Sequence, residues 1–368
     1  MTAGWHAAGL VTLGLAAGAA SAAQSAGVEL KTLTYAVRGG KDLQLDLYIP
    51  TNTGGARLPV IVFLHGGGWS GGTRTTGPDF RRFFAQDGFA MASIEYRLTP
   101  EITFPSNVED VKTAVRWLRA NAGVHRLDPN RICLWGTSAG GHLAAVAALA
   151  PKGTFEGDDH LTQSSAAQCV LDAYGPTKFD VMDAQTSEEQ ATLQPQAPAL
   201  LNAAPMPGAP GGPGRRGGAA MQHELPTSPE SRLVGAALQS VPERVRAASP
   251  LSYVRAGAPP FLIMHGLADN SVPHGQSFLL YEALAAAGNE VTLRLVDGLP
   301  HTFFNRTDLD DIAGPFRMTV RERARGAAER RTEDRAGVFA VARAFFQKHL
   351  GRSPQKEGRA SARPRWAG

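Results

Sequence analysis

Short apolar runs of strand length recur along most of the chain, separated by polar segments. The run at 58–64, Leu-Pro-Val-Ile-Val-Phe-Leu, is almost continuously apolar, which is typical of a strand buried on both faces. Similar runs follow at intervals that leave room for a helix between them. The predicted core strands are 58–64, 89–96, 131–135, 169–174, 260–265 and 291–296.

Segments with helical spacing lie between these strands. From 106 to 118, valine and leucine recur at three- and four-residue steps, and Ser106 with Glu109 has the pattern of a capping box. Alternation of strands and helices predicts one α/β domain over 28–350, with a mostly parallel central sheet and helices on both faces. The predicted helices are 106–118, 139–150, 275–287 and 338–350.

Three further segments depart from this alternation. Residues 28–50 alternate apolar and polar positions around Gly39-Gly40, which predicts an antiparallel hairpin. Residues 185–230 hold eight Pro and six Gly, and we interpret 197–218 within them as a disordered insertion. Residues 309–335 are rich in Arg, Glu and Asp, which favours an exposed helix or an irregular excursion.

The N-terminus has the composition of an export signal. Residues 7–23 are uncharged and rich in Ala, Gly and Leu, and they end in the small-residue pattern Ala20-Ser21-Ala22. We therefore expect residues 1–23 to be a cleaved signal and the protein to be periplasmic or secreted. A disordered leader on a cytoplasmic protein is the alternative. A stable membrane span is not expected, because this stretch is weakly hydrophobic and no other is long enough.

Overall composition is that of an ordinary globular protein with a substantial core. Hydrophobic residues make up 43% of the 368 positions and charged residues 19%. The formal net charge of +4 resides entirely in the last seventeen residues. A basic end of this kind is typical of a solvated, disordered tail, predicted here at 351–368, and gives no reason to expect a nucleic-acid partner.

Two cysteines, Cys133 and Cys169, fall in predicted core strands. We interpret both as buried thiols that pack as small apolar side chains. A disulfide between them is the alternative in an exported chain. Two cysteines cannot form a zinc site by themselves, and no metal site is predicted.

Residues 136–140, Gly-Thr-Ser-Ala-Gly, connect a predicted buried strand to a predicted helix. In that context G-x-S-x-G is typical of a sharp turn that presents a nucleophilic serine, here Ser138, at the end of a sheet. The helix that follows Ser138 places its N-terminal dipole where negative charge develops. A glycine-rich turn with an incidental serine is the alternative.

A second glycine cluster, His65-Gly66-Gly67-Gly68-Trp69, also follows a predicted strand. Bare backbone N–H groups can approach a developing oxyanion closely, so Gly66 and Gly67, with Ala139, are candidate oxyanion-hole donors. The alternative is a flexible loop without a chemical role.

A serine nucleophile needs a general base and a carboxylate that orients it. Asp269 and His301 each follow a predicted strand, and the order Ser138, Asp269, His301 is the order of α/β-hydrolases. Asp297 is a rival acid, but it precedes a glycine in the loop of His301 itself, as a turn-forming aspartate does. The histidines expected to pack or to form local hydrogen bonds are His65, His142, His265 and His274.

Together these motifs resemble the hormone-sensitive-lipase-like esterases, and more closely the bacterial feruloyl- and acetylxylan-esterase-like (BD-FAE-like) domains. The resemblance spans about 30–308 and the last helix, leaving out 185–230. It rests on 65–69, on Glu-Tyr-Arg-Leu-Thr-Pro-Glu at 95–101, on Phe-Pro at 104–105, on 136–144 and on 251–269.

This resemblance implies an α/β-hydrolase fold and a serine esterase without a metal or organic cofactor. It implies Ser138, Asp269 and His301 as the triad, Gly66, Gly67 and Ala139 as oxyanion donors, and Tyr96-Arg97 as support for the glycine loop. The expected substrate is a small carboxylic ester, with carbohydrate esters among the candidates. The alternatives are an exopeptidase or amidase on the same triad and a non-catalytic module that binds a ligand on a hydrolase fold.

Overall fold

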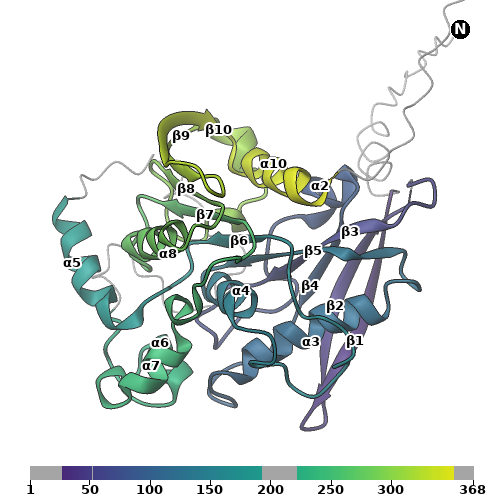
Figure 1. The fold of residues 1–368 in the computed structure, drawn as a ribbon, viewed down its shortest axis with the longest axis horizontal. Helices are drawn as coiled ribbons and strands as arrows, with labels where there is room; N and C mark the ends of the chain where they lie inside the picture. Colours follow the sequence, from purple (N-terminus) through teal and green to yellow (C-terminus); the bar gives the residue numbers. More distant parts are fainter. Residues whose placement is uncertain (1–26, 52, 193–221, 352–368) are drawn as a thin grey trace, which may run out of the picture.

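The computed structural model describes residues 27–51, 53–192 and 222–351, and its centre is one ten-stranded sheet. The strands lie side by side in the order β1-β2-β4-β3-β5-β6-β7-β8-β9-β10 (Figure 1). Their bounds are β1 Val28–Arg38, β2 Lys41–Pro50, β3 Leu58–Leu64, β4 Ala90–Ile94, β5 Leu127–Thr137, β6 Val170–Ala173, β7 Phe261–Gly266, β8 Val291–Val296, β9 Phe316–Arg323 and β10 Arg330–Ala336.

Six central strands, from β4 through β3 to β8, pair in parallel, which confirms the predicted α/β arrangement. The predicted N-terminal hairpin is also confirmed, because β1 pairs antiparallel with β2 around the Gly39-Gly40 turn. In a sheet of this kind the loops after the carboxyl ends of the strands gather at one edge, where ligands bind.

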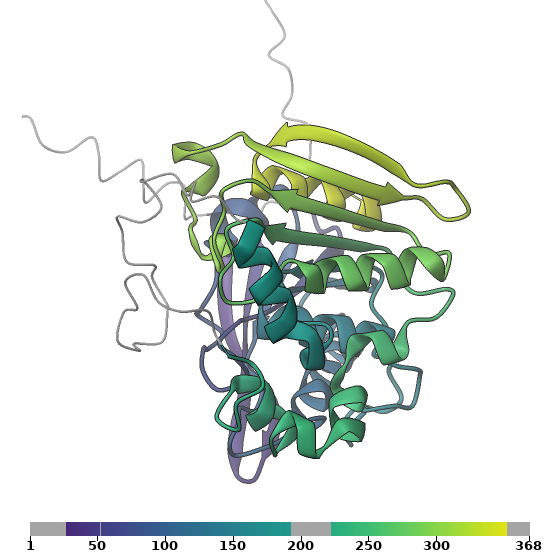
Figure 2. The same cartoon turned by 90° about the vertical axis from the view of Figure 1, so that its left-hand side faces the viewer.

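Helices cover both faces of the sheet (Figures 1 and 2). One face packs against α3 (Ser106–Ala120), α4 (Ala139–Leu149) and α8 (Gly275–Ala286), and these contribute to one apolar cluster. The opposite face packs against α2 (Phe80–Phe83) and α10 (Val338–Leu350), which belong to a second cluster around Trp135. Because each central strand faces both clusters, its apolar run has no polar face.

The segment between β6 and β7 builds the side of the molecule seen in Figure 2. It holds α5 (Met182–Thr192), α6 (Pro229–Val234) and α7 (Pro242–Ala248). The start of the predicted low-complexity interval 185–230 is thus helical, in α5, and its last two residues begin α6. The insertion expected at 197–218 lies outside the described residues. The short remaining helices are η1 Ala85–Asp87, η2 Phe179–Val181, η4 Leu238–Ser240, η5 Pro250–Tyr253, η6 Phe303–Asn305 and α9 Leu309–Ile312.

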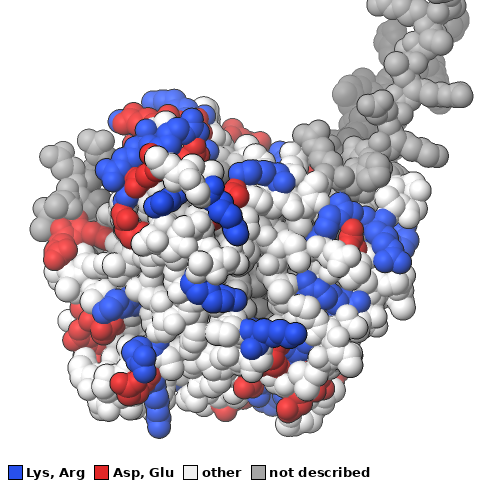
Figure 3. Space-filling model, viewed as in Figure 1, with Lys and Arg blue, Asp and Glu red and all other residues white. Residues whose placement is uncertain are grey.

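The charged segment 309–335 is mostly strand, and the expectation of an exposed helix or an irregular excursion was wrong. β9 pairs antiparallel with both β8 and β10 and so extends the sheet. Phe316, Met318 and Val320 point into the core at every second position, while charged side chains occupy most other positions. Figure 3 shows Lys, Arg, Asp and Glu side chains gathered over this hairpin.

The capping box expected at the start of α3 does not form. The carbonyl of Pro105 accepts the first helical hydrogen bonds, from the N–H groups of Val108 and Glu109, so Ser106 lies inside the first turn. Glu109 instead lies 3.5 Å from the Arg97 guanidinium.

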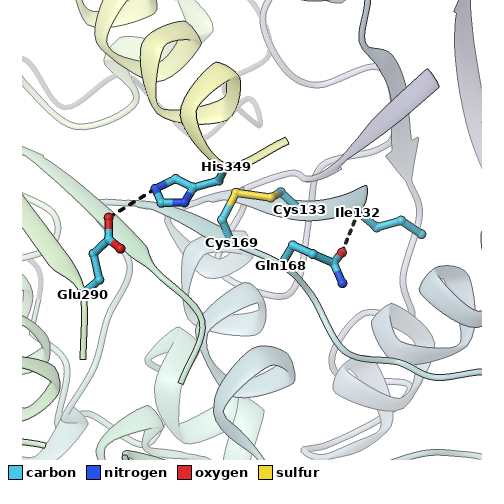
Figure 4. Close-up of a disulfide and its surroundings, with 6 residues drawn as sticks. All are labelled: Ile132, Cys133, Gln168, Cys169, Glu290 and His349. Atoms are coloured by element: carbon cyan, nitrogen blue, oxygen red, sulfur yellow. Dashed lines mark hydrogen bonds and ion pairs between the residues drawn. A yellow bond between two sulfur atoms is a disulfide. The ribbon is translucent and has the colours of Figure 1, made fainter. Parts of the chain in front are cut away.

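Cys133 and Cys169 form a disulfide, so the interpretation as two buried thiols was wrong (Figure 4). Cys133 is in β5 and Cys169 directly precedes β6, so their Cα atoms lie only 4.7 Å apart on neighbouring strands. The Leu134 N–H donates to the carbonyl of Cys169, and both cysteines are buried. Strand pairing therefore brings the two sulfur atoms within bonding distance.

The predicted signal at 1–23 and the basic tail beyond Gly351 lie outside the described residues. Among the helices of the described part of the chain, none has the length and apolar character required to cross a bilayer.

Candidate active site

Ser138 occupies a sharp turn between the end of β5 and the start of α4. Its backbone has φ 54° and ψ −122°, a conformation that a non-glycine residue adopts only under strain and that is frequent at functional sites. The backbone before the turn lies very close to the backbone after it, since a Cβ added at Gly136 would lie 2.0 Å from the carbonyl oxygen of Gly140. The predicted strand–turn–helix context of the serine is therefore confirmed.

The structure brings Ser138, His301 and Asp269 together from three different loops. The Ser138 Oγ lies 2.9 Å from Nε2 of His301. On the other side of the ring, Nδ1 of His301 lies 2.6 Å from Oδ2 of Asp269. The hydrogen-bonded chain from hydroxyl to imidazole to carboxylate is the arrangement needed to activate a serine.

Asp269 is buried, and the surrounding groups favour its ionised form. Its Oδ1 accepts hydrogen bonds from the backbone N–H groups of Ser271 and Val272, at 2.8 and 2.9 Å. Burial alone would raise the pKa of Asp269, but the charge and hydrogen bonds of His301 and His265 outweigh it and hold the pKa well below the usual range. The carboxylate therefore stays anionic beside the His301 ring.

His265 also contacts Asp269, a role that was not predicted from the sequence. Its Nε2 lies 3.1 Å from Oδ2 of Asp269 and 3.0 Å from the carbonyl oxygen of Val272. Because both neighbours are acceptors, Nε2 carries the proton, and Nδ1 accepts from the Ser277 hydroxyl at 2.7 Å. The expectation of local hydrogen bonds was right but incomplete, because His265 also fixes the orientation of Asp269.

Gly66 and Gly67 lie beside the serine on the loop after β3. A Cβ added at Gly66 would lie 3.1 Å from the Ser138 Cβ, and one at Gly67 would lie 2.3 Å from the Gly71 carbonyl oxygen. Among the described residues none accepts a hydrogen bond from the N–H of Gly66 or Gly67. Ala139 is the first residue of α4, where a backbone N–H has no intrahelical partner. All three predicted donors therefore line one cavity with Ser138.

Two buried histidines hold this glycine loop in place. The His65 ring stacks on Tyr96, whose hydroxyl donates to the carbonyl of His65 at 2.7 Å. Trp69 donates its indole N–H to Nδ1 of His142, 3.2 Å away. Burial lowers the pKa of each histidine to about 4, so both rings are neutral at neutral pH. Neither is suited to be the base, as expected.

The other rivals also lie elsewhere. The Asp297 side chain is exposed and faces Arg317, with a closest charged-atom distance of 3.9 Å. His274 pairs with Glu189, its Nδ1 lying 2.8 Å from the carboxylate. Arg97, expected to support the glycine loop, binds Asp110 and the carbonyl of Ser106 instead.

The cavity at Ser138 has a volume of about 320 Å³, close to the lower end of the range for small-molecule sites. A larger surface hollow of about 710 Å³ lies beside α7 and includes neither the serine nor its partners. Besides Ser138, His301 and the three predicted oxyanion donors, the cavity is lined by Gly68, Trp69, Gly72, Thr76, Thr137, Tyr174, Pro176, Pro229, Glu230, Ser271, Val272, Thr302 and Asn305.

The residues described contain no group of three or more His, Cys, Asp or Glu side chains arranged to hold a metal ion. The groups gathered around Ser138 are its own hydroxyl, the His301 imidazole with the Asp269 carboxylate behind it, and the backbone donors.

Comparison with known proteins finds a matching family and several esterases that resemble this chain. The BD-FAE family model matches residues 45–208 and 216–284. The esterase LipQ of Mycobacterium tuberculosis is 31% identical over 252 residues, which are 68% of this chain and 51% of LipQ. LipC of the same organism is 30% identical over 67% of this chain and 53% of LipC. The chain thus spans about half the length of these curated relatives.

Solved structures agree on the fold. A truncated carbohydrate esterase from gut microbiota matches 87% of this chain and 96% of its own, with a TM-score of 0.63 and 24% identity. The thermophilic esterase Est2 of Thermogutta terrifontis, with propionate bound, is 29% identical over 78% of this chain and 89% of its own, with a TM-score of 0.56. Est2 has also been solved phosphorylated by paraoxon. These matches confirm the α/β-hydrolase fold.

Proposed function

The chain belongs to the BD-FAE family, and on that premise we propose that it hydrolyses carboxylic esters with Ser138 as its nucleophile. The observation that carries the proposal is the hydrogen-bonded chain Ser138–His301–Asp269 at the wall of a cavity lined by free backbone donors. The esterase relatives support the same reaction class.

In the proposed first half-reaction, Nε2 of His301 takes the hydroxyl proton while Oγ of Ser138 attacks the ester carbonyl carbon. The negative charge that develops on the carbonyl oxygen is stabilised by the N–H groups of Gly66, Gly67 and Ala139. His301 then gives its proton to the departing alcohol, which leaves the acyl group on Ser138.

In the second half-reaction His301 takes a proton from water while the water oxygen attacks the acyl carbon. The bond between that carbon and Oγ of Ser138 then breaks, His301 returns the proton to Oγ, and the carboxylic acid leaves. Asp269 holds the His301 ring in the tautomer with its proton on Nδ1 and stabilises the imidazolium formed in both halves. Since the pKa of Asp269 lies far below its usual range, the carboxylate keeps its charge throughout.

The cavity volume of about 320 Å³ favours esters of short acyl chains. Est2, a relative, has been solved with propionate and with butyrate bound, which supports the same size class for this chain. Esters of carbohydrates are the alcohol class to test first beside simple alkyl esters.

A fluorophosphonate probe tests the nucleophile directly, since paraoxon phosphorylates the relative Est2. The wild-type protein should be labelled and should turn over p-nitrophenyl acetate to butyrate faster than the decanoate. Ser138→Ala should lose both labelling and turnover. Labelling that persists in Ser138→Ala refutes the assignment, and faster turnover of aminoacyl p-nitroanilides than of esters would replace the esterase with an amidase.

We also propose that the protein is exported. The predicted signal at 1–23 supports this, and so does the disulfide between Cys133 and Cys169, because disulfides persist in oxidising compartments. Fractionation of the native host with N-terminal sequencing is the test. A protein found in the cytoplasm with its first residues intact would refute it.

A further inference from the structure

Glu230 and His223 form a buried acid–base pair next to the candidate active site. Glu230, the second residue of α6, lines the cavity, whereas His223 lies in the segment that leads to α6. Oε1 of Glu230 lies 3.0 Å from Nδ1 of His223, and neither side chain is more than 3% exposed. The preceding residue, Pro229, packs on the glycine loop, with its Cβ 3.2 Å from a Cβ added at Gly68. The pair thus lies beside the predicted oxyanion donors.

The described residues leave part of this pair without hydrogen-bond partners. Oε2 of Glu230 and Nε2 of His223 are buried, and in the described part of the chain neither has a hydrogen-bond partner. The neighbouring Ser231 Oγ is also buried without a hydrogen-bond partner among the described residues. Burying polar groups without partners is unfavourable, so native proteins rarely keep several of them together.

The backbone on both sides of the pair is held from outside the cavity. Oδ1 of Asp183, in α5, accepts the backbone N–H of His223 at 2.6 Å, and its Oδ2 accepts the N–H of Glu224 at 3.0 Å. The Ser228 hydroxyl caps α6 by accepting the N–H of Ser231 at 3.0 Å. Glu230 is therefore not a freely moving surface carboxylate.

A purely structural role accounts poorly for this arrangement. An ion pair retained for stability has its remaining polar atoms satisfied, and a pair of apolar side chains would fill the same volume without that desolvation cost. The bond from Nδ1 of His223 occupies only Oε1 of Glu230. Oε2 has no donor among the described residues, and it belongs to a residue that lines the cavity, so it is left to accept from a group bound there.

We propose that Glu230 is a specificity residue whose free carboxylate oxygen accepts a hydrogen bond from the substrate. The substrates selected are esters that carry a donor, a hydroxyl or an ammonium group, on the part seated against α6. This inference rests on the proposed esterase activity. An acceptor shielded from bulk water discriminates strongly between substrates with and without a donor, because a substrate without one leaves the acceptor unpaired.

Two matched ester series test the inference on the full-length protein, one for each side of the ester. The acyl series consists of p-nitrophenyl butyrate, 3-hydroxybutyrate and 3-aminobutyrate. The alcohol series consists of the butyrates of cyclohexanol, trans-4-hydroxycyclohexanol and trans-4-aminocyclohexanol. In one series the wild-type enzyme should favour a donor-bearing ester about tenfold to hundredfold in kcat/KM, the range expected for a hydrogen bond to a charged group. The hydroxyl and ammonium arms show which donor is selected.

Glu230→Gln should bring that ratio close to one, because the amide offers a weaker, uncharged acceptor. Glu224→Gln is the matched control: it removes the same charge from an exposed side chain six positions away and should keep the wild-type ratio. If Glu230→Gln does not fold, Glu230→Asp replaces it, and its retracted carboxylate should lower the ratio.

The inference is overturned if the wild-type enzyme shows no preference in either series, or if the preference survives substitution of Glu230. Turnover of the plain esters without any preference refutes only this inference. Absence of turnover for every ester, with no labelling of Ser138, refutes the proposed function itself.

Discussion

The disulfide between Cys133 and Cys169 should supply a large part of the stability of the fold. The perturbation that isolates it is chemical reduction of the wild-type protein, because this breaks one bond and keeps every side chain. The two cysteines are 36 positions apart, so the bond closes a loop that includes the end of β5, all of α4 and the segment leading to β6.

The loop length sets the expected magnitude. In the chain-entropy relation, closing a loop of 36 residues lowers the entropy of the unfolded chain by an amount worth about 4 kcal/mol at 25 °C. Domains are stable by only about 5 to 15 kcal/mol, so reduction should remove a substantial fraction of the free energy of unfolding.

Guanidinium denaturation followed by tryptophan fluorescence, with and without reductant, measures the difference. The midpoint should move to lower denaturant on reduction. The double variant Cys133→Ala/Cys169→Ala is the control, since its unfolding should be insensitive to reductant. Equal free energies of unfolding for the oxidised and reduced protein would refute the reasoning, as would two free thiols titrated in the denatured, unreduced protein.

Three further predictions concern the active site and the core behind it. Asp269→Asn should lower kcat by about 10⁴-fold with little change in folding, because the amide favours the wrong tautomer of His301. Steady-state kinetics with p-nitrophenyl butyrate measures this, and a loss below tenfold would contradict the role of Asp269. Gly67→Ala should lower kcat by about 10² to 10³, because the added Cβ would lie 2.3 Å from the Gly71 carbonyl oxygen and push the N–H of residue 67 out of place. An unchanged kcat in the same assay would exclude Gly67 from the oxyanion hole. Burial raises the pKa of Asp172 to about 7, so between about pH 4 and pH 7 the folded protein holds a proton that the unfolded chain has released. The free energy of unfolding therefore falls as the pH rises through this range. Asp172→Asn should therefore raise the free energy of unfolding by about 4 kcal/mol at pH 8 and change it little at pH 4. Urea denaturation at both pH values measures the difference, and an equal effect at both would contradict the buried charge as its cause.

The central fold could be predicted from the sequence because its signals there are strong and local. A strand buried on both faces must be apolar throughout, as at β3, and a glycine-flanked serine between a strand and a helix is a specific pattern. Ser138, Asp269 and His301 could be grouped from their positions in the chain, because loops after parallel strands end at the same edge of the sheet.

The failures arose where the deciding contact is not local. The disulfide depends on the alignment of β5 with β6, which no spacing in the chain encodes. The alternation of Phe316, Met318 and Val320 was present in the sequence, but surrounding charges hid it.

His265 and Glu230 were missed for a related reason. Each has a partner that only the fold brings close, because His265 lies beside Asp269 and Glu230 beside His223. Glu230 also lies at the end of an interval whose Pro and Gly content predicts little regular structure. A histidine followed four residues later by the triad acid was the only signal for His265.

The last strand of the sheet, β10, has a consequence for how the protein behaves at high concentration. An edge strand presents unpaired backbone groups that another chain can join, and long edge strands of this kind nucleate aggregates. Nearly every side chain of β10 is exposed, and Arg330, Arg331, Glu333, Asp334 and Arg335 carry charge. Docking a foreign strand there would strip water from those charges. The edge therefore resists growth of the sheet into an intermolecular one, even in concentrated solution.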